Sequence, residues 1–136
     1  MTDTVARILW IEDDLALASL FIVRMQMEGF VVRHCQDGEA GLEALKDFSP
    51  DLVLLDLMMP RVSGFDVLDT IRHTAGIAQP KVVILSAMGQ PEDRDKALKL
   101  GADDYLVKSR LALDDIIRAI RRDLGLPENA SKTVKV

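Results

Sequence analysis

The sequence predicts an α/β fold, in which a parallel β-sheet carries helices on both of its faces. Five short apolar segments alternate along the chain with five segments whose apolar residues recur at helical spacing. The segment Val53–Leu55 is apolar at every position, which is typical of a strand buried on both faces. Because parallel neighbours need a crossover connection, this regular alternation indicates a parallel sheet.

Turn and cap residues delimit the expected elements. The strands are expected at Ile8–Ile11, Val31–Cys35, Val53–Leu55, Lys81–Leu85 and Asp104–Val107. The first helix should begin after Asp14, a good N-cap residue, and stop at Gly29. The later helices are expected to begin at Asp37–Glu39, Gly64, Pro91 and about Leu113. Helical spacing predicts that their core-facing residues include Leu42, Leu45 and Phe48, then Phe65, Leu68 and Ile71, then Leu113, Ile116, Ile117, Ile120 and Leu124.

The bulk properties fit a single domain in a reducing compartment. The chain has 136 residues and is 49% hydrophobic, so one domain is expected over residues 1–126, with a polar, flexible tail at 127–136. The net charge of -5 disfavours direct contact with nucleic acid. The single cysteine, Cys35, cannot form an internal disulfide. With no signal-peptide pattern and no apolar run of transmembrane length, we expect a cytoplasmic location and no membrane insertion.

Polar side chains gather at the ends of the expected strands. Four of the five strands end in charged or reactive residues, namely Glu12–Asp13, Asp56, Ser86 and Lys108. In a parallel sheet these ends lie at one edge, and open α/β sheets bind their ligands at that edge. A lone aspartate after a strand is as readily a turn or cap residue, but four such endings together indicate a site.

The acids at this edge predict a magnesium site. Glu12, Asp13 and Asp56 would repel one another unless a cation bound among them. All-oxygen ligands favour Mg²⁺, whereas no cysteine–histidine cluster offers a site to Zn²⁺. His34 and His73 are isolated in the sequence and are expected to be surface or spectator residues.

Two further side chains suit this edge to phosphoryl chemistry. Lys108 supplies a fixed positive charge and Ser86 supplies a hydroxyl donor. A metal, an ammonium and a hydroxyl around one carboxylate can hold a phosphoryl group. If Asp56 takes that group, it becomes an acyl phosphate, a known form of nucleophilic carboxylate chemistry.

These motifs, in this order and spacing, resemble the receiver domain of two-component response regulators over about residues 7–124. The matching segments are Ile8-Leu9-Trp10-Ile11-Glu12-Asp13-Asp14, Leu54-Leu55-Asp56-Leu57-Met58-Met59-Pro60, Leu85-Ser86-Ala87 and Gly101-Ala102-Asp103-Asp104-Tyr105-Leu106-Val107-Lys108. The resemblance implies a flavodoxin-like, doubly wound (βα)5 fold with a five-stranded parallel sheet of order 2-1-3-4-5. In that order the strands that precede Asp13 and Asp56 are neighbours.

The resemblance also implies a role for each acid. Asp56 corresponds to the phosphoacceptor and Asp13 to the direct Mg²⁺ ligand. Glu12 would act on the metal through water, and the backbone carbonyl of Met58 would be a further ligand. Met58 and Met88 would flank the path of attacking water, which leads to the hypothesis that the phosphoryl group is lost slowly; simple loop packing explains these methionines equally well.

The remaining site residues resemble the switch of the family. Ser86 corresponds to the hydroxyl that bonds the phosphoryl oxygen and Lys108 to the lysine that pairs with it. Tyr105 corresponds to the switch aromatic, whose ring the small Ala87 would allow to turn inward; a half-buried strand tyrosine is the alternative. The family usually has proline after the lysine, in a cis bond, whereas Ser109 stands here. Because a non-proline cis bond costs about 2.5–4 kcal/mol, we expect the Lys108–Ser109 bond to be trans, or cis only under strain.

The implied function is a signalling switch rather than a conventional enzyme. A phosphohistidine on a histidine kinase or histidine phosphotransfer protein would donate to Asp56, and the surface of the last two helices and last strand would then change its affinity for a protein target. Charged residues of these helices are candidates for a partner face, although solvated helix faces look the same: Glu92, Asp93, Arg94, Arg118 and Arg121.

Three other classes of function compete with this interpretation. A hydrolase with an aspartyl nucleophile would tend to carry a second acid two residues after it, where this chain has Met58. A degenerate receiver that serves only for docking would not need the complete acidic set. A nucleotide-binding module is disfavoured because no glycine-rich phosphate loop follows the first strand.

Overall fold

The computed structural model describes residues 5–87 and 89–128. The strands are β1 (Arg7–Ile11), β2 (Val31–Cys35), β3 (Leu52–Leu55), β4 (Lys81–Ser86) and β5 (Asp104–Val107). The helices are α1 (Leu15–Met27), α2 (Gly38–Phe48), α3 (Gly64–Arg72), α4 (Pro91–Lys99) and α5 (Leu113–Asp123), and a short 3-10 helix covers Lys108–Arg110. All strand pairs are parallel and their order is β2-β1-β3-β4-β5, which confirms the expected fold class and sheet order.

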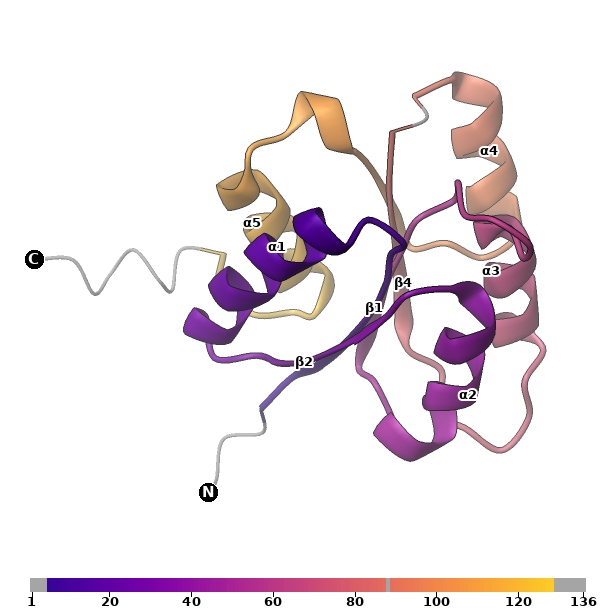
Figure 1. Ribbon diagram of the computed structural model, residues 1–136, viewed down its shortest axis with the longest axis horizontal. Helices are drawn as coiled ribbons and strands as arrows, with labels where there is room; N and C mark the ends of the chain where they lie inside the picture. The colour runs from indigo at the N-terminus through magenta and orange to yellow at the C-terminus, as the bar shows by residue number, and fades with distance from the viewer. Residues whose placement is uncertain (1–4, 88, 129–136) are drawn as a thin grey trace, which may run out of the picture.

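Helices cover the sheet on both faces, with α1 and α5 on one face and α2, α3 and α4 on the other (Figure 1). Each strand supplies both layers because successive side chains point to opposite faces. In β1, Ile8 and Trp10 face α1 and α5, while Leu9 and Ile11 face α2 and α3, and all four side chains are fully buried. None of the described helices is long and apolar enough to cross a lipid bilayer.

Local capping signals account for several helix ends. Asp14 caps α1 by accepting a hydrogen bond from the backbone N–H of Leu17 at 3.1 Å, as expected. Asp37 and Ser63 cap α2 and α3 in the same way. Gly29 has a φ of 95°, a left-handed conformation that ends the α1 segment at little cost to glycine.

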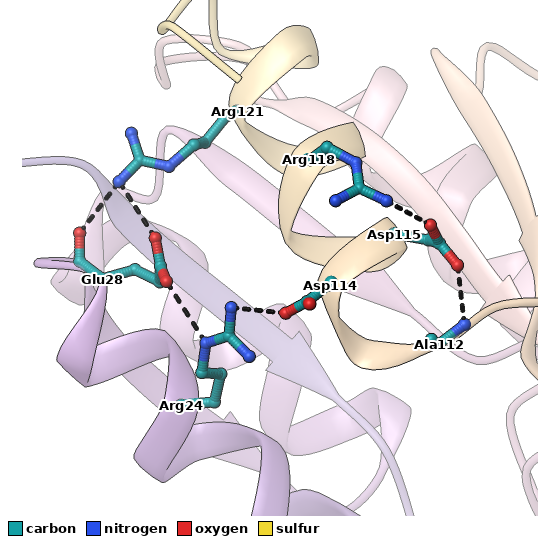
Figure 2. Close-up of polar contacts among 7 residues, drawn as sticks. All are labelled: Arg24, Glu28, Ala112, Asp114, Asp115, Arg118 and Arg121. Carbon is teal, nitrogen blue, oxygen red and sulfur yellow. Dashed lines mark hydrogen bonds and ion pairs between the residues drawn. The ribbon is translucent and has the colours of Figure 1, made fainter. Parts of the chain in front are cut away.

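A polar layer joins α1 to α5 (Figure 2). Arg24 Nη2 lies 2.6 Å from Asp114 Oδ1, and Arg24 Nε lies 3.2 Å from Glu28 Oε2. Arg121 is buried and donates to the backbone carbonyl of Glu28 at 3.1 Å and to its Oε1 at 3.3 Å. The interpretation of Arg121 as part of a partner face is therefore wrong, whereas Arg118 stays partly exposed beside Asp115.

The sheet order brings the ends of β1 and β3 together. Ile11 is the register partner of Leu55, and the backbone N–H of Asp56 donates to the carbonyl of Ile11 at 3.1 Å. Glu12 follows Ile11 directly, so two acids leave adjacent strands at the same level. The strand order reverses here, which is where doubly wound sheets place their ligands.

Candidate functional site at the carboxyl edge of the sheet

Three carboxylates converge at this edge. One oxygen from each of Glu12, Asp13 and Asp56 lies within 4.8 Å of the other two. Glu12 is fully buried and Asp56 is 4% exposed, whereas Asp13 is exposed to solvent. Among the described residues this is the cluster of three acidic, histidine or cysteine side chains whose spacing suits a metal ion. The predicted meeting of these acids at one edge is thus seen in the structure.

Glu12 is held firmly by its surroundings. Its Oε2 accepts a hydrogen bond from the backbone N–H of Asp14 at 3.1 Å, and its own N–H donates to the carbonyl of Cys35 at 3.0 Å. Lys108 Nζ lies 2.8 Å from its Oε1, close enough to pair although the approach departs from hydrogen-bond geometry. Burial raises the pKa of Glu12, the Lys108 contact opposes that rise, and the charge of Asp56 adds to it.

Asp56 follows the last residue of β3, and its carboxylate contacts a backbone N–H and an ammonium. Its Oδ1 accepts a hydrogen bond from the backbone N–H of Met58 at 3.1 Å, and its Oδ2 lies 3.6 Å from Lys108 Nζ. Burial raises the pKa of Asp56, the Met58 N–H and Lys108 oppose the rise, and the charge of Asp13 adds to it. The cost of holding negative charge here would fall if a cation bound beside it.

Lys108 reaches both buried acids from the first turn after β5. It begins the 3-10 helix Lys108–Arg110, which the sequence pattern did not indicate. No peptide bond in the described part of the chain is cis, so the Lys108–Ser109 bond is trans, as expected for serine at this position.

The expected switch residues lie on the two strands beyond β3. Ser86 ends β4 and is fully buried, and Ala87 after it is exposed. Tyr105 is only 5% exposed and packs in the core layer that contains Ala97 of α4. Burial raises the pKa of the Tyr105 hydroxyl. The ring therefore lies inward in this structure. Met58 is exposed and Met88 lies outside the described residues, so the hypothesis of slow phosphoryl loss stays a prediction.

His34 is half-buried on the edge strand β2 and makes a contact that its isolation in the sequence did not indicate. Its Nε2 lies 2.6 Å from the backbone carbonyl oxygen of Glu12, and its ring meets Trp10 edge-on at 6.2 Å between centroids. Sequence reasoning missed this because strand register determines the contact: Trp10 and His34 are parallel partners. His73, by contrast, is exposed at the end of α3.

The donor set at this edge fits Mg²⁺. It consists of carboxylate oxygens, which are the ligands that this hard cation prefers. Three carboxylates against one ammonium leave an excess of negative charge in a largely buried setting, which a divalent cation would relieve.

A groove of about 600 Å³ lies at the opposite edge of the sheet from the acidic site. It is lined in part by Asp51, Lys81 and Arg72. The guanidinium of Arg72 is already bound to the carbonyl of Gly101 at 2.9 Å and to Asp103 at 2.8 Å. This groove is therefore built around a structural arginine, and the candidate site remains at the carboxyl edge.

A doubly wound sheet with three acids and a lysine at its switch point defines the receiver class of signalling domain. The family model described as the response regulator receiver domain matches residues 8–121, and the chain belongs to this family.

Relatives and solved structures agree with this assignment. The chain is 47% identical over 102 residues to the transcriptional regulatory protein CpxR of Escherichia coli K12, and 40% identical over 102 residues to the DNA-binding dual master transcriptional regulator RpaA of Synechocystis. Each match covers 75% of this chain but 42% of the relative, so the chain spans less than half the length of either protein. The signal receiver domain of a putative LuxO repressor protein from Vibrio parahaemolyticus has a TM-score of 0.82 and 26% identity, with 98% of this chain and 99% of that chain covered.

Proposed function

We propose that Asp56 accepts a phosphoryl group from a phosphohistidine on a partner protein, with Mg²⁺ bound beside it. The observation that carries this proposal is the convergence of Glu12, Asp13 and Asp56 within 4.8 Å, with Lys108 in reach of the two buried acids. The partner would be a histidine kinase or a histidine phosphotransfer protein, and the setting would be the cytoplasm.

The metal would be held by residues on the two central strand ends. Asp13 and Asp56 would bind it through carboxylate oxygens, Met58 through its backbone carbonyl, and Glu12 through water. When bound, Mg²⁺ would screen the negative charge of the carboxylates and of the incoming phosphoryl group.

The transfer itself needs little from the protein beyond position and charge. An oxygen of the Asp56 carboxylate forms a bond to phosphorus while the bond from phosphorus to the histidine nitrogen breaks. The electron pair of the broken bond goes to the imidazole, which takes up a proton from solvent. The Met58 N–H on Oδ1 and the ammonium of Lys108 both favour the ionised form of Asp56 that this step requires.

The phosphorylated state would differ from the present one in its polar contacts. Lys108 would pair with a phosphoryl oxygen, and the hydroxyl of Ser86 would bond another. Tyr105 would respond through its packing against α4, and the surface formed by α4, β5 and α5 would change its affinity for a protein target. The phosphoryl group would favour that state only by the free energy of the contacts it gains there.

The target would be reached through this surface rather than by direct contact of this domain with nucleic acid. CpxR and RpaA are named as transcriptional regulators, and the chain matches 42% of each, so in them the output involves further sequence. Here the target that binds the surface would be a separate protein or another part of a longer polypeptide. We expect transfer to Asp56 but no turnover of phosphate esters.

Acetyl phosphate with Mg²⁺ tests the proposal, because this small donor replaces the kinase. Intact mass spectrometry should detect one added phosphoryl group on the wild type and none on Asp56→Asn. Asp66→Asn, at an exposed position on α3, is the matched control and should be labelled like the wild type. Labelling of Asp56→Asn would overturn the proposal, and a wild type that is never labelled would favour a docking module.

A further inference from the structure

We propose that His34 is a positioning residue for the metal site, through its hydrogen bond to the backbone carbonyl of Glu12. This inference rests on the proposed function, since it concerns how the protein prepares its acids for Mg²⁺. His34 lies on the edge strand β2, outside the acidic cluster, and would not touch the metal or the phosphoryl group.

The contact defines which atom carries the hydrogen. Nε2 of His34 lies 2.6 Å from the Glu12 oxygen, and a carbonyl oxygen can only accept a hydrogen bond. Nε2 must therefore be the protonated ring nitrogen. The short distance indicates a firm bond at a half-buried position.

The bond acts at the point where regular strand pairing stops. The register of β1 with β2 ends at Ile11 and Cys35, and the N–H of Glu12 makes one more bond, to Cys35. The next group along the chain is the carbonyl of Glu12, which the His34 side chain binds. Where the backbone of β2 turns toward α2 and no longer pairs with β1, the His34 side chain thus supplies the next hydrogen bond between the two segments.

This carbonyl belongs to the peptide unit that joins Glu12 to Asp13. Because a peptide unit is planar, fixing its oxygen fixes the direction in which the chain enters Asp13. The carboxylate of Glu12 already has its own contacts, with Asp14 and Lys108, but the carboxylate of Asp13 is exposed. The orientation of the Asp13 carboxylate therefore depends on the backbone at Asp13, and the hydrogen bond from His34 holds that backbone in place.

The histidine ring is itself anchored well enough to serve this purpose. It makes a T-shaped contact with Trp10, which is fully buried and packs against Phe21 at 5.4 Å between ring centroids. The position of the donor is thus tied to the hydrophobic layer under α1. A fixed donor reduces the entropy that Asp13 would lose when it binds a cation.

Loss of the His34 donor should weaken Mg²⁺ binding without removing any ligand. His34→Leu keeps an apolar group against Trp10 but cannot donate, whereas His34→Gln keeps an N–H donor. One net hydrogen bond corresponds to about a fivefold change in dissociation constant. We expect His34→Leu to raise the Mg²⁺ dissociation constant by about that factor and His34→Gln to recover at least half of the loss on a logarithmic scale.

Two measurements separate positioning from general damage. Calorimetric titration with MgCl₂ gives the affinity of each variant, and single-turnover labelling with acetyl phosphate over a range of Mg²⁺ gives the half-saturating concentration and the maximal rate. For His34→Leu both the dissociation constant and the half-saturating concentration should rise, while the maximal rate stays within about twofold of the wild type. His73→Leu, at the exposed histidine, should match the wild type in every value. If His34→Leu does not fold, His34→Asn, whose amide is too short to reach, replaces it with the same expectation.

Each outcome decides between the claims. Equal Mg²⁺ affinity in His34→Leu and the wild type would overturn the positioning role. A fall in maximal rate at unchanged affinity would overturn it too, because the histidine would then act on the transfer. A wild type that neither binds Mg²⁺ nor is labelled would instead refute the proposed function, so the two failures are distinguishable.

Discussion

Lys108 Nζ lies 2.8 Å from Glu12 Oε1, closer than the 3.6 Å that separates it from Asp56 Oδ2. The ammonium therefore pairs mainly with the acid beside the proposed phosphoacceptor, and Asp56 is left with the weaker share of the positive charge. A lysine held in this way neutralises a fully buried glutamate and stays within reach of a group that arrives on Asp56.

Removal of the Lys108 charge should destabilise the protein and increase its dependence on Mg²⁺. In Lys108→Met, Glu12 stays buried without its cation, which should cost about 1–3 kcal/mol of unfolding free energy in the absence of metal. Urea titration measures this loss. Added Mg²⁺ should recover part of it, so the metal should stabilise the variant more than the wild type. Lys99→Met, on the exposed side of α4, is the control and should change stability by less than about 0.5 kcal/mol. Equal metal-induced stabilisation in Lys108→Met and the wild type would count against the shared site.

Asp13→Asn should slightly stabilise the protein in the absence of Mg²⁺ but should make it less stable than the wild type in the presence of Mg²⁺. Without Mg²⁺ the substitution removes a charge that disfavours ionised Asp56, and because Asp13 is exposed the gain should be at most about 0.5 kcal/mol. At a Mg²⁺ concentration ten times the dissociation constant, the unfolding free energy of the wild type should rise by about 1.4 kcal/mol, and that of the variant should not. Thermal unfolding with and without Mg²⁺ measures both effects. An Asp13→Asn variant that Mg²⁺ stabilises as well as it does the wild type would exclude Asp13 as a ligand.

Arg121 should contribute to stability and not to phosphoryl transfer. Arg121→Met leaves the buried carboxylate of Glu28 with Arg24 alone, and the loss should be about 2–3 kcal/mol. Arg118→Met, whose partner is the neighbouring Asp115, should cost less than about 0.5 kcal/mol. Chemical denaturation compares the two variants, and both should be labelled by acetyl phosphate at the wild-type rate. An equal loss in the two variants would contradict the structural role of Arg121.

Asp123 should make stability depend on pH. Its pKa is raised to about 7, first by burial and then by a hydrogen bond and charge from Asp104. For Asp104, burial opposes ionisation, but hydrogen bonds from Asp123 and from the N–H of Tyr105 outweigh it and lower the pKa. An acid whose pKa is higher in the folded state than in the unfolded state stabilises the fold while it is protonated, so its contribution is full below about pH 4 and is lost as the pH rises toward about 7.

Asp123→Asn removes that titration. We therefore expect urea unfolding between pH 5 and pH 8 to show a change in the difference between the two proteins. The unfolding free energy of the wild type minus that of Asp123→Asn should fall by about 1 kcal/mol or more as the pH rises. The difference between the two proteins isolates Asp123, since other acids titrate in both. A difference that does not change with pH would show that Asp123 titrates in its ordinary range.

The fold and the acidic edge followed from the sequence because both depend on local patterns. Continuous apolar segments marked the central strands, and a polar residue directly after a strand can lie only at its end. The structure extends β4 by one residue, so Ser86 ends the strand instead of following it. Leu42, Phe65, Leu113 and Leu124, expected in the core, are only partly buried at its margin.

The contacts that sequence reasoning missed join residues far apart in the chain. His34 reaches Glu12 through strand register, and Arg121 reaches Glu28 across 93 residues through its long side chain. The sequence made Arg121 a candidate for a partner face, because a charged residue at the margin of an amphipathic helix has the same pattern whether it is solvated or paired. Tertiary packing resolves such cases, and periodicity does not.

The most direct test of the central claim is peptide mass mapping of the acetyl phosphate product, made in Mg²⁺ and in a chelator. If the converging acids form a cation site that prepares Asp56, one phosphoryl group should be found on the peptide that contains Asp56 in Mg²⁺ and almost none in the chelator, with Asp13→Asn resembling the chelated wild type. Labelling of Asp56 that proceeds equally well in the chelator, or a phosphoryl group carried by another residue, would contradict the account.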